Sequence, residues 1–238
     1  MRFEGQKIVI VGGSSGMGLA TAKMAAAEGA TIVIASRSED RLRQARAQIQ
    51  GKVELNTINI MDEGSIKGFF DKIGEFNHLA TPGSEAVRGK FLELDVKEAR
   101  KAFDSKFWGQ YQLAKYGAPR IREGGSITFF AGIWSQRPVF GAAVVAAINS
   151  AVEGLGRALA VELAPIRVNT VSPGIVDTPL YSGMEPGKRN AMFQGIAASI
   201  PAKRVGRPED IAQTVLYLMA NGYTTGSTLY VDGGATLR

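Results

Sequence analysis

Residues 8–30 read IVIVGGSSGMGLATAKMAAAEGA, and this stretch decides the fold that we expect for the chain. It begins with four β-branched residues, which favour a buried strand, and ends in an alanine-rich run that favours a helix. Gly12, Gly16 and Gly18 lie between the two, where a tight turn and close packing leave little room for side chains. The stretch therefore predicts a strand, a glycine turn and a helix that packs back on the strand.

The same alternation continues through the rest of the chain. Short runs rich in β-branched and aromatic residues predict strands at 7–12, 31–36, 53–60, 126–132, 166–172 and 228–234. Helical periodicity predicts helices at 17–28, 39–49, 63–73, 96–118, 142–163 and 209–220. Strands that alternate with helices form a parallel sheet that is covered on both faces. We therefore predict one doubly wound α/β domain over residues 1–238.

Residues 173–207 break this alternation. They contain a loop, the short amphipathic piece GKRNAMFQGIAASI and a second loop. Long excursions of this kind are usually functional, and doubly wound sheets bind ligands beside the carboxyl ends of their strands. We interpret the segment at about 179–202 as a lid over a substrate.

The composition excludes several classes of site and partner. The chain has no cysteine and one histidine, which excludes thiolate and histidine-rich metal sites, so we expect no metal. Its formal charge of +6 is spread among acidic residues, so we expect no nucleic-acid partner. No run reaches the roughly 18 uninterrupted apolar residues of a membrane span, and the N-terminal residues soon turn polar. We expect no membrane contact and a cytoplasmic location.

The glycine turn also predicts a binding site. Backbone amides at the start of a helix, together with the helix dipole, attract anions, and glycines let a pyrophosphate approach the backbone. A glycine pattern alone can mark no more than a tight turn, but here the flanking strand and helix are both predicted. We therefore predict a dinucleotide site. Its turn comprises Gly12, Ser14, Ser15, Gly16, Met17 and Gly18.

The end of the next predicted strand indicates which dinucleotide binds. NAD-binding proteins usually place an acid there to hold the ribose 2′-hydroxyl group. This chain has Ser36 at that position and Arg37 directly after it. A guanidinium pairs well with a 2′-phosphate, which an acid would repel. The pattern predicts NADP rather than NAD; the alternative is that Arg37 is an ordinary solvated residue at a strand end.

Taken together, these features resemble the short-chain dehydrogenase/reductase family. The three glycines follow its GxxxGxG spacing, and three later stretches match its landmarks in order. These stretches are SITFFAG, AVEGLGRALAVELAPIRVNTVSPGIVDTP and RVGRPEDIAQTVLYLMANGYTTGSTLYVDGG. The resemblance covers nearly the whole chain. It implies a Rossmann-like domain with a seven-stranded parallel sheet, assembled as a homodimer or homotetramer.

The resemblance also implies further residues around the cofactor. Asn59 and Ile60 would border the adenine, and Gly83 falls where the family has an Asn-Asn-Ala-Gly stretch. The nicotinamide end would be held by a group of four residues that follow the predicted strand at 166–172. They are Pro173, Gly174, Ile175 and Thr178.

The family's reductases use a tyrosine acid, a lysine four residues later, a serine on the preceding strand and an asparagine on the preceding long helix. In this chain the tyrosine and serine positions are Val145 and Gly132, the lysine position is Asn149, and the asparagine position is Lys106. Because lysine and asparagine have changed places, we hypothesise that one pocket keeps an ammonium and an amide. The alternative is independent drift, with Asn149 a hydrogen-bonded core amide and Lys106 a surface residue.

This exchange does not restore the proton donor, since valine and glycine side chains donate no proton. Asp177, which follows the Pro-Gly turn, is a further catalytic candidate. Other candidates lie nearby, namely Ser135, Gln136, Arg137 and Tyr181.

Two functions are consistent with these residues. The first is an NADP-dependent oxidoreductase with a non-standard active site that transfers hydride to or from a small organic substrate of the carbonyl or iminium type. The alternative is a catalytically inactive NADP-binding protein that acts as a cofactor sensor or binding partner. A non-redox enzyme for cyclisation or isomerisation is a third, lesser possibility.

Overall fold

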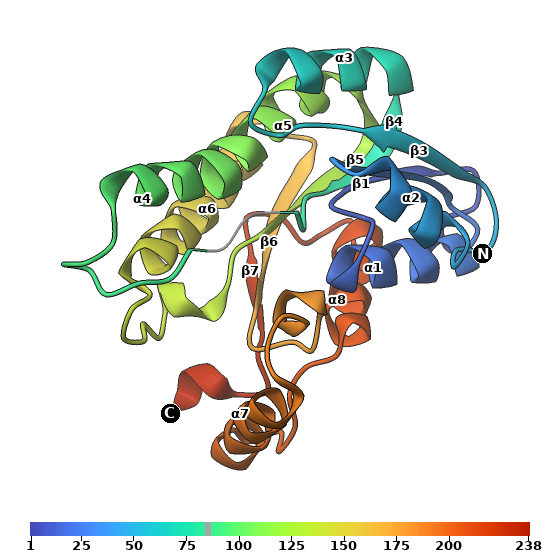
Figure 1. Cartoon of the computed structure of the whole chain (residues 1–238). Helices are drawn as coiled ribbons and strands as arrows, with labels where there is room; N and C mark the ends of the chain where they lie inside the picture. The colour runs from blue at the N-terminus through green and yellow to red at the C-terminus, as the bar shows by residue number, and fades with distance from the viewer. Residues whose placement is uncertain (84–86) are drawn as a thin grey trace.

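A seven-stranded parallel sheet forms the centre of the molecule (Figure 1). The computed structural model describes residues 1–83 and 87–238. The order across the sheet is β3-β2-β1-β4-β5-β6-β7, and each neighbouring pair runs parallel. The strands are β1 (Lys7–Val11), β2 (Thr31–Ser36), β3 (Val53–Thr57), β4 (Phe76–Ala80), β5 (Ile121–Phe130), β6 (Arg167–Pro173) and β7 (Thr228–Val231). This confirms the predicted doubly wound α/β fold.

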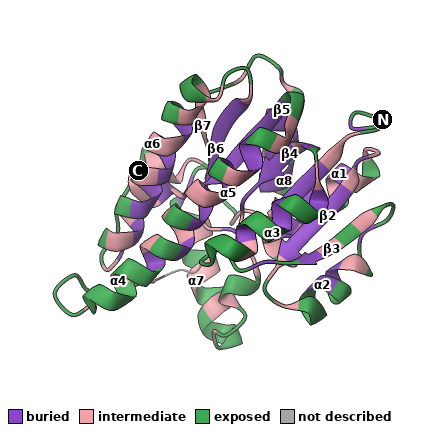
Figure 2. Cartoon of the chain, turned by 90° about the horizontal axis from the view of Figure 1, so that it is seen from above, coloured by how far each residue is buried: buried purple, intermediate pink, exposed green. Residues whose placement is uncertain are grey.

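Helices cover both faces of the sheet, and each face has its own apolar core. In β1, Ile8 and Ile10 pack into one core while Val9 and Val11 pack into the other, so the strand is apolar on both sides. Figure 2 shows the buried strands between helices whose outer surfaces are exposed. The first core includes residues of α1 (Gly16–Ala27), α2 (Glu39–Arg46) and α8 (Pro208–Ala220). The second includes residues of α3 (Glu63–Ile73), α4 (Val96–Phe103), α5 (Gly109–Gly117) and α6 (Ala143–Glu162).

The strand order reverses beside β1. The chain runs from β1 outward to β2 and β3, and then returns to β4 on the other side of β1. The segments that follow β1 and β4 therefore diverge at the carboxyl ends of adjacent strands, where the Gly83 amide donates a hydrogen bond of 3.1 Å to the Val11 carbonyl. Parallel α/β sheets bind ligands at such a point.

The helix expected at 96–118 has a π-helical segment in its middle. It begins as α4, continues as η1 (Asp104–Trp108) and ends as α5. A π-helical turn displaces the residues within it from ordinary helical positions, and such turns are frequent at functional sites. Lys106 lies at the centre of η1.

Helix α6 is long and apolar enough to cross a membrane if judged only by length and composition, and it is the one such helix in the described part of the chain. In this structure it packs against β5 and β6, and Ile148 and Val152 belong to the core. Asn149 and Glu153 are buried on the same helix. Six of its twenty residues are buried in this way, so packing inside the domain accounts for one face of the helix.

Candidate functional site

A cleft of about 910 Å³ lies at the carboxyl ends of the strands. The turn after β1, the ends of β2 to β6 and the short segment η4 (Pro179–Tyr181) form its walls. It contains every residue that the sequence predicts to bind the cofactor, namely Gly12, Ser14, Ser15, Gly16, Met17, Gly18, Ser36, Arg37, Asn59, Ile60, Gly83, Pro173, Gly174, Ile175 and Thr178. Lys106, Gly132, Val145 and Asn149 line the same cleft. The predicted cofactor site and the family's catalytic positions are therefore adjacent.

The glycine turn after β1 brings backbone segments into direct contact. Gly12 has a φ of +98°, and a Cβ atom on it would lie 2.4 Å from the Gly83 nitrogen. A Cβ atom on Gly18 would lie 2.2 Å from the Gly12 oxygen. Helix α1 begins at Gly16 without an acidic residue in its first turn and without a side-chain cap. Its first backbone amides and its positive dipole end are suited to an anion.

The end of β2 adds positive charge to the cleft. Arg37 follows Ser36 there, and Ser38 and Arg41 line the same region. The Ser38 hydroxyl group accepts a hydrogen bond of 3.3 Å from the Arg41 amide and caps α2. Sequence reasoning missed Ser38 and Arg41. The sequence signal that could have indicated them is a serine N-cap that is preceded by Arg37 and followed by Arg41. This arrangement brings two guanidinium groups to the start of one helix.

A buried glutamine positions the backbone of Lys106. Gln110 Nε2 donates to the Lys106 carbonyl at 3.0 Å and to the Phe130 carbonyl at 3.0 Å. Its Oε1 accepts from the Phe130 amide at 2.8 Å and from the Thr81 hydroxyl group at 2.7 Å. The side chain thus ties η1 to the ends of β4 and β5. Sequence reasoning did not single out Gln110, because an interior glutamine looks like any other polar helix residue.

The side chains of Lys106 and Asn149 are in direct contact. Lys106 Nζ donates to Asn149 Oδ1 at 2.7 Å and to the Ala131 carbonyl at 2.8 Å. Burial lowers the pKa of Lys106 to about 8, although the nearby Glu153 carboxylate opposes this change. The structure therefore brings together the two residues that the hypothesis of exchanged positions pairs.

Apolar side chains surround this polar pair. Val145 on α6, together with Ile133 and Trp134 in η3 (Ile133–Ser135), lines one part of the cleft. Leu180 and Tyr181 of η4 line another, and the Tyr181 ring contacts Phe193 edge to face at 5.5 Å between ring centroids. An apolar space with a few convergent polar groups is typical of sites for small organic molecules.

Comparison with known proteins identifies the family. A family model described as Enoyl-(Acyl carrier protein) reductase matches residues 11–236. A short-chain dehydrogenase/reductase of Stachybotrys chlorohalonatus is 32% identical over 252 residues, covering 99% of this chain and 99% of that protein. The chain belongs to the short-chain dehydrogenase/reductase family. The family is one of oxidoreductases, as the resemblance in the sequence implied.

Solved structures of short-chain dehydrogenases and reductases share the fold over the whole chain. A small-chain dehydrogenase in complex with NADPH is 38% identical, with a TM-score of 0.86 over 98% of this chain and 99% of that one. The MalC Reductase/Diels-Alderase of Malbranchea aurantiaca is 25% identical, with a TM-score of 0.93 over 100% of this chain and 98% of that one.

In this short-chain dehydrogenase/reductase, Asp177 lies apart from Lys106 and Asn149. It does not line the cleft, and its carboxylate forms an ion pair with Arg189 of α7 (Pro186–Ser199). The Asp177 amide donates to the Gly206 carbonyl at 2.9 Å. These contacts join the segment after β6 to the segment predicted as a lid.

The other proton-donor candidates occupy different places. Tyr181 lines the cleft, and burial raises the pKa of its hydroxyl group. Ser135 donates to the buried Glu153 carboxylate at 2.6 Å, and Gln136 does so at 3.5 Å. Arg137 donates to the Ala235 carbonyl. Of these candidates, the structure brings Tyr181 to the cleft.

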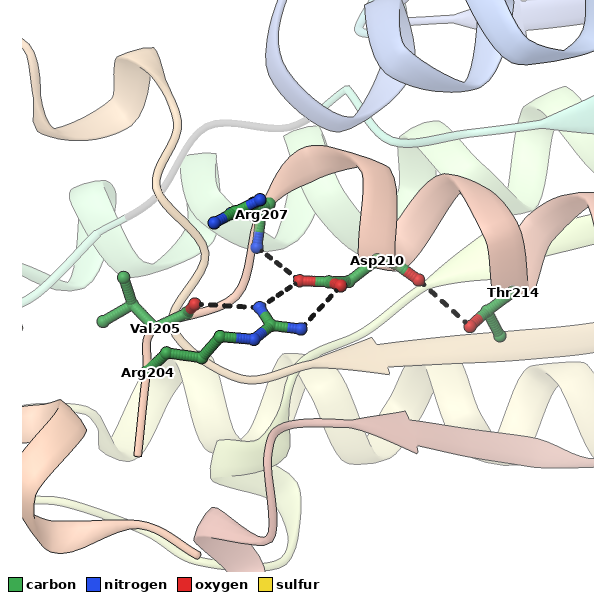
Figure 3. A network of polar contacts seen from close by, with 5 residues as sticks. All are labelled: Arg204, Val205, Arg207, Asp210 and Thr214. Atoms are coloured by element: carbon green, nitrogen blue, oxygen red, sulfur yellow. Dashed lines mark hydrogen bonds and ion pairs between the residues drawn. The ribbon is translucent and has the colours of Figure 1, made fainter. Parts of the chain in front are cut away.

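An ion-pair network connects the segment just after the predicted lid to α8 (Figure 3). The guanidinium of Arg204 donates to both carboxylate oxygens of Asp210, at 2.6 and 2.8 Å. The Asp210 carboxylate also accepts from the Arg207 amide at 2.7 Å, which satisfies an amide at the start of the helix. Asp177 thus binds α7 to the segment after β6, and Asp210 binds the segment after α7 to the start of α8.

Proposed function

We propose that this short-chain dehydrogenase/reductase is an NADP-dependent oxidoreductase with a non-standard active site, which transfers hydride to or from a small organic substrate of the carbonyl or iminium type. The observation that carries this proposal is the 2.7 Å hydrogen bond between Lys106 Nζ and Asn149 Oδ1. It places an ammonium next to the predicted cofactor residues, in a cleft where the family's tyrosine and serine positions hold Val145 and Gly132.

The residues present fit an NADP molecule. A Cβ atom on Gly12 or Gly18 would collide with neighbouring backbone, so the turn consists of bare backbone at these positions. The start of α1 offers its amides to a pyrophosphate. Arg37 and Arg41 line the cleft after β2, and their guanidinium groups would pair with a 2′-phosphate bound there. The similarity to a small-chain dehydrogenase in complex with NADPH supports this cofactor. When bound, NADPH supplies the hydride.

The chain's own groups supply the rest of the chemistry. Lys106 holds a proton at Nζ inside the cleft, and a positioned general acid typically contributes about 10²- to 10⁴-fold in rate. Val145, Trp134 and Leu180 offer apolar surface that displaces water from the substrate. Tyr181 and the predicted lid segment around it would close over the bound molecule.

The cofactor prediction is tested by Arg37→Ala. Loss of a charge-assisted pair with the 2′-phosphate removes about 1.5–3 kcal/mol, so NADPH affinity is expected to fall about 10- to 100-fold while NADH affinity changes little. Both affinities are measured by calorimetric titration. Arg43→Ala is the matched control, because Arg43 lies on α2 outside the cleft and pairs with Glu39. Equal losses for both dinucleotides would contradict the prediction.

The redox function is tested with a panel of acceptors. The protein is incubated with NADPH and ketones, enones or cyclic iminium ions, and the nicotinamide absorbance is followed. Loss of absorbance with any acceptor class supports the oxidoreductase. Tight NADPH binding without oxidation by any acceptor would instead support the cofactor-sensing alternative.

A further inference from the structure

Gly132 and Asn149 fit together in a way that the sequence does not reveal. A Cβ atom on Gly132 would lie 3.0 Å from Asn149 Nδ2, a tight contact that would require the amide to shift by a few tenths of an ångström. The φ of Gly132 is 164°, an extended conformation open to any residue, so the contact and not the backbone favours glycine here. The amide of Asn149 therefore takes up the space into which a side chain at position 132 would project.

The orientation of this amide follows from its neighbour. A lysine ammonium only donates hydrogen bonds, so Asn149 must turn its oxygen toward Lys106. Its NH₂ group then faces Gly132 and the cleft that both residues line. A hydrogen-bond donor thus stands beside the position where the family has its serine hydroxyl group.

Lys106 provides a second donor at the same place. An ammonium has three N–H groups, and two of them are used by Ala131 and Asn149. The third has no partner among the residues that the structure describes. The Lys106 and Asn149 donors therefore lie side by side on one wall of the cleft.

The charge around these donors favours a substrate that becomes negative. None of the described residues that line the cleft is Asp or Glu, whereas Lys106, Arg37 and Arg41 all line it. The Lys106 ammonium would repel a cationic iminium, because Glu153, the carboxylate that acts on this ammonium, is not among the described residues that line the cleft. A carbonyl oxygen, which gains negative charge as its carbon accepts hydride, would be stabilised.

We propose that Lys106 and Asn149 form an oxyanion site that depends on glycine at position 132, and that the substrate is a ketone or an enone. This inference rests on the proposed oxidoreductase function. Hydride adds to the carbonyl carbon, or to the β-carbon of an enone, and the π electrons move to oxygen. The oxygen then takes a proton from Lys106 Nζ, which leaves a neutral amine that regains its proton from solvent.

The oxyanion site is first tested without turnover. In the presence of NADP⁺, 4-nitrophenolate is expected to bind about tenfold or more tightly than nitrobenzene, because a negative oxygen gains charge-assisted hydrogen bonds. Binding is followed by the visible absorbance of the phenolate. Lys106→Met and Asn149→Ala are expected to abolish this preference, whereas Lys97→Met, at an exposed lysine of α4, keeps it. Absence of the preference in the wild-type protein, including absence of any phenolate binding, would overturn the inference.

Turnover gives a second test. Lys106→Met is expected to lower ketone or enone reduction at least about 100-fold, which is the contribution of a general acid, without lowering the reduction of a cyclic iminium. Iminium turnover without a phenolate preference would support the oxidoreductase function and contradict the oxyanion site. A phenolate preference without turnover of any acceptor would support the oxyanion site and contradict the oxidoreductase function.

Position 132 gives a third test. Gly132→Ser is expected to remove the phenolate preference while NADPH affinity is kept, because the new side chain displaces the Asn149 amide. Gly68→Ala is the matched control, since a Cβ atom there meets nothing within 4 Å. If Gly132→Ser does not fold, Gly132→Ala, which adds only the Cβ atom, decides the question by the same measurement. An unchanged phenolate preference in folded Gly132→Ser would refute the need for glycine.

Discussion

Lys106 is the residue on which the proposed chemistry depends. Its amine is held by Ala131 and Asn149, and burial lowers its pKa to about 8. The Glu153 carboxylate opposes this change, and it is held in turn by Ser135, Ser172 and Tyr230 at 2.6, 3.3 and 3.1 Å. An amine with a pKa near neutrality can give up its proton and regain it within a catalytic cycle.

A pH profile tests this assignment. Lys106 is charged below about pH 8 and neutral above it, so carbonyl reduction is expected to be constant below this pH and to fall as the pH rises through it. The measurement is kcat with a saturating ketone or enone on both sides of pH 8. Lys97→Met is expected to give the same profile. A profile that stays flat well above pH 8 would rule out Lys106 as the proton donor.

At the scale of elements, the turn between β1 and α1 is the most constrained part of the cleft. Gly12, Gly18 and Gly83 bring three pieces of backbone into contact, and backbone atoms cannot rotate away as a side chain does. The shape of this turn, and with it the position of the first amides of α1, follows from the absence of side chains at these positions.

Gly18→Ala is expected to disturb this turn. Its Cβ atom would lie 2.2 Å from the Gly12 oxygen, so either α1 or the turn must move. Overpacking of this kind destabilises by about 1–3 kcal/mol, and NADPH and NADH affinities are expected to fall together. Urea unfolding and calorimetric titration measure the two effects, with Gly68→Ala as the control. Unchanged affinities would show that the turn does not hold the cofactor.

Most elements, and the pairing of Lys106 with Asn149, could be predicted from the sequence because apolar periodicity and family spacing are local signals. The π-helical segment η1 could not, since residues 96–118 keep an ordinary helical pattern through it. The contact between Gly132 and Asn149 could not either, because it depends on side-chain geometry between β5 and α6. The sequence prediction of the cofactor site did not include Ser38 and Arg41, because it considered only Ser36 and Arg37 at the end of the strand at 31–36.

At the scale of the whole molecule, a buried polar contact links the sheet to the N-terminal segment. The ring of His78 on β4 hydrogen-bonds to Ser126 of β5 at 2.9 Å and to Gln6 at 2.8 Å. Burial, and secondarily the charge of Arg167, lower its pKa from 6.5 to about 4. These contacts give the single histidine of the chain a structural role.

The stability of the domain is therefore expected to depend on pH in a defined window. The unfolded chain protonates His78 below about pH 6.5 while the folded chain does not, so stability is lost as the pH falls from 6.5 toward 4. The loss is at most about 3 kcal/mol. Urea unfolding across this window measures it, and His78→Gln, which leaves no imidazole in the chain, is expected to remove it. An identical pH dependence in His78→Gln would contradict the assignment.

The contacts among Lys106, Gly132 and Asn149 restrict the order in which mutations can accumulate. Asn149→Lys alone would set two ammonium groups against each other in a partly buried space, and Gly132→Ser alone would push into the amide of Asn149. Each of these two substitutions alone therefore creates an electrostatic or steric conflict. A change at one of these positions is therefore expected to require a compensating change at another.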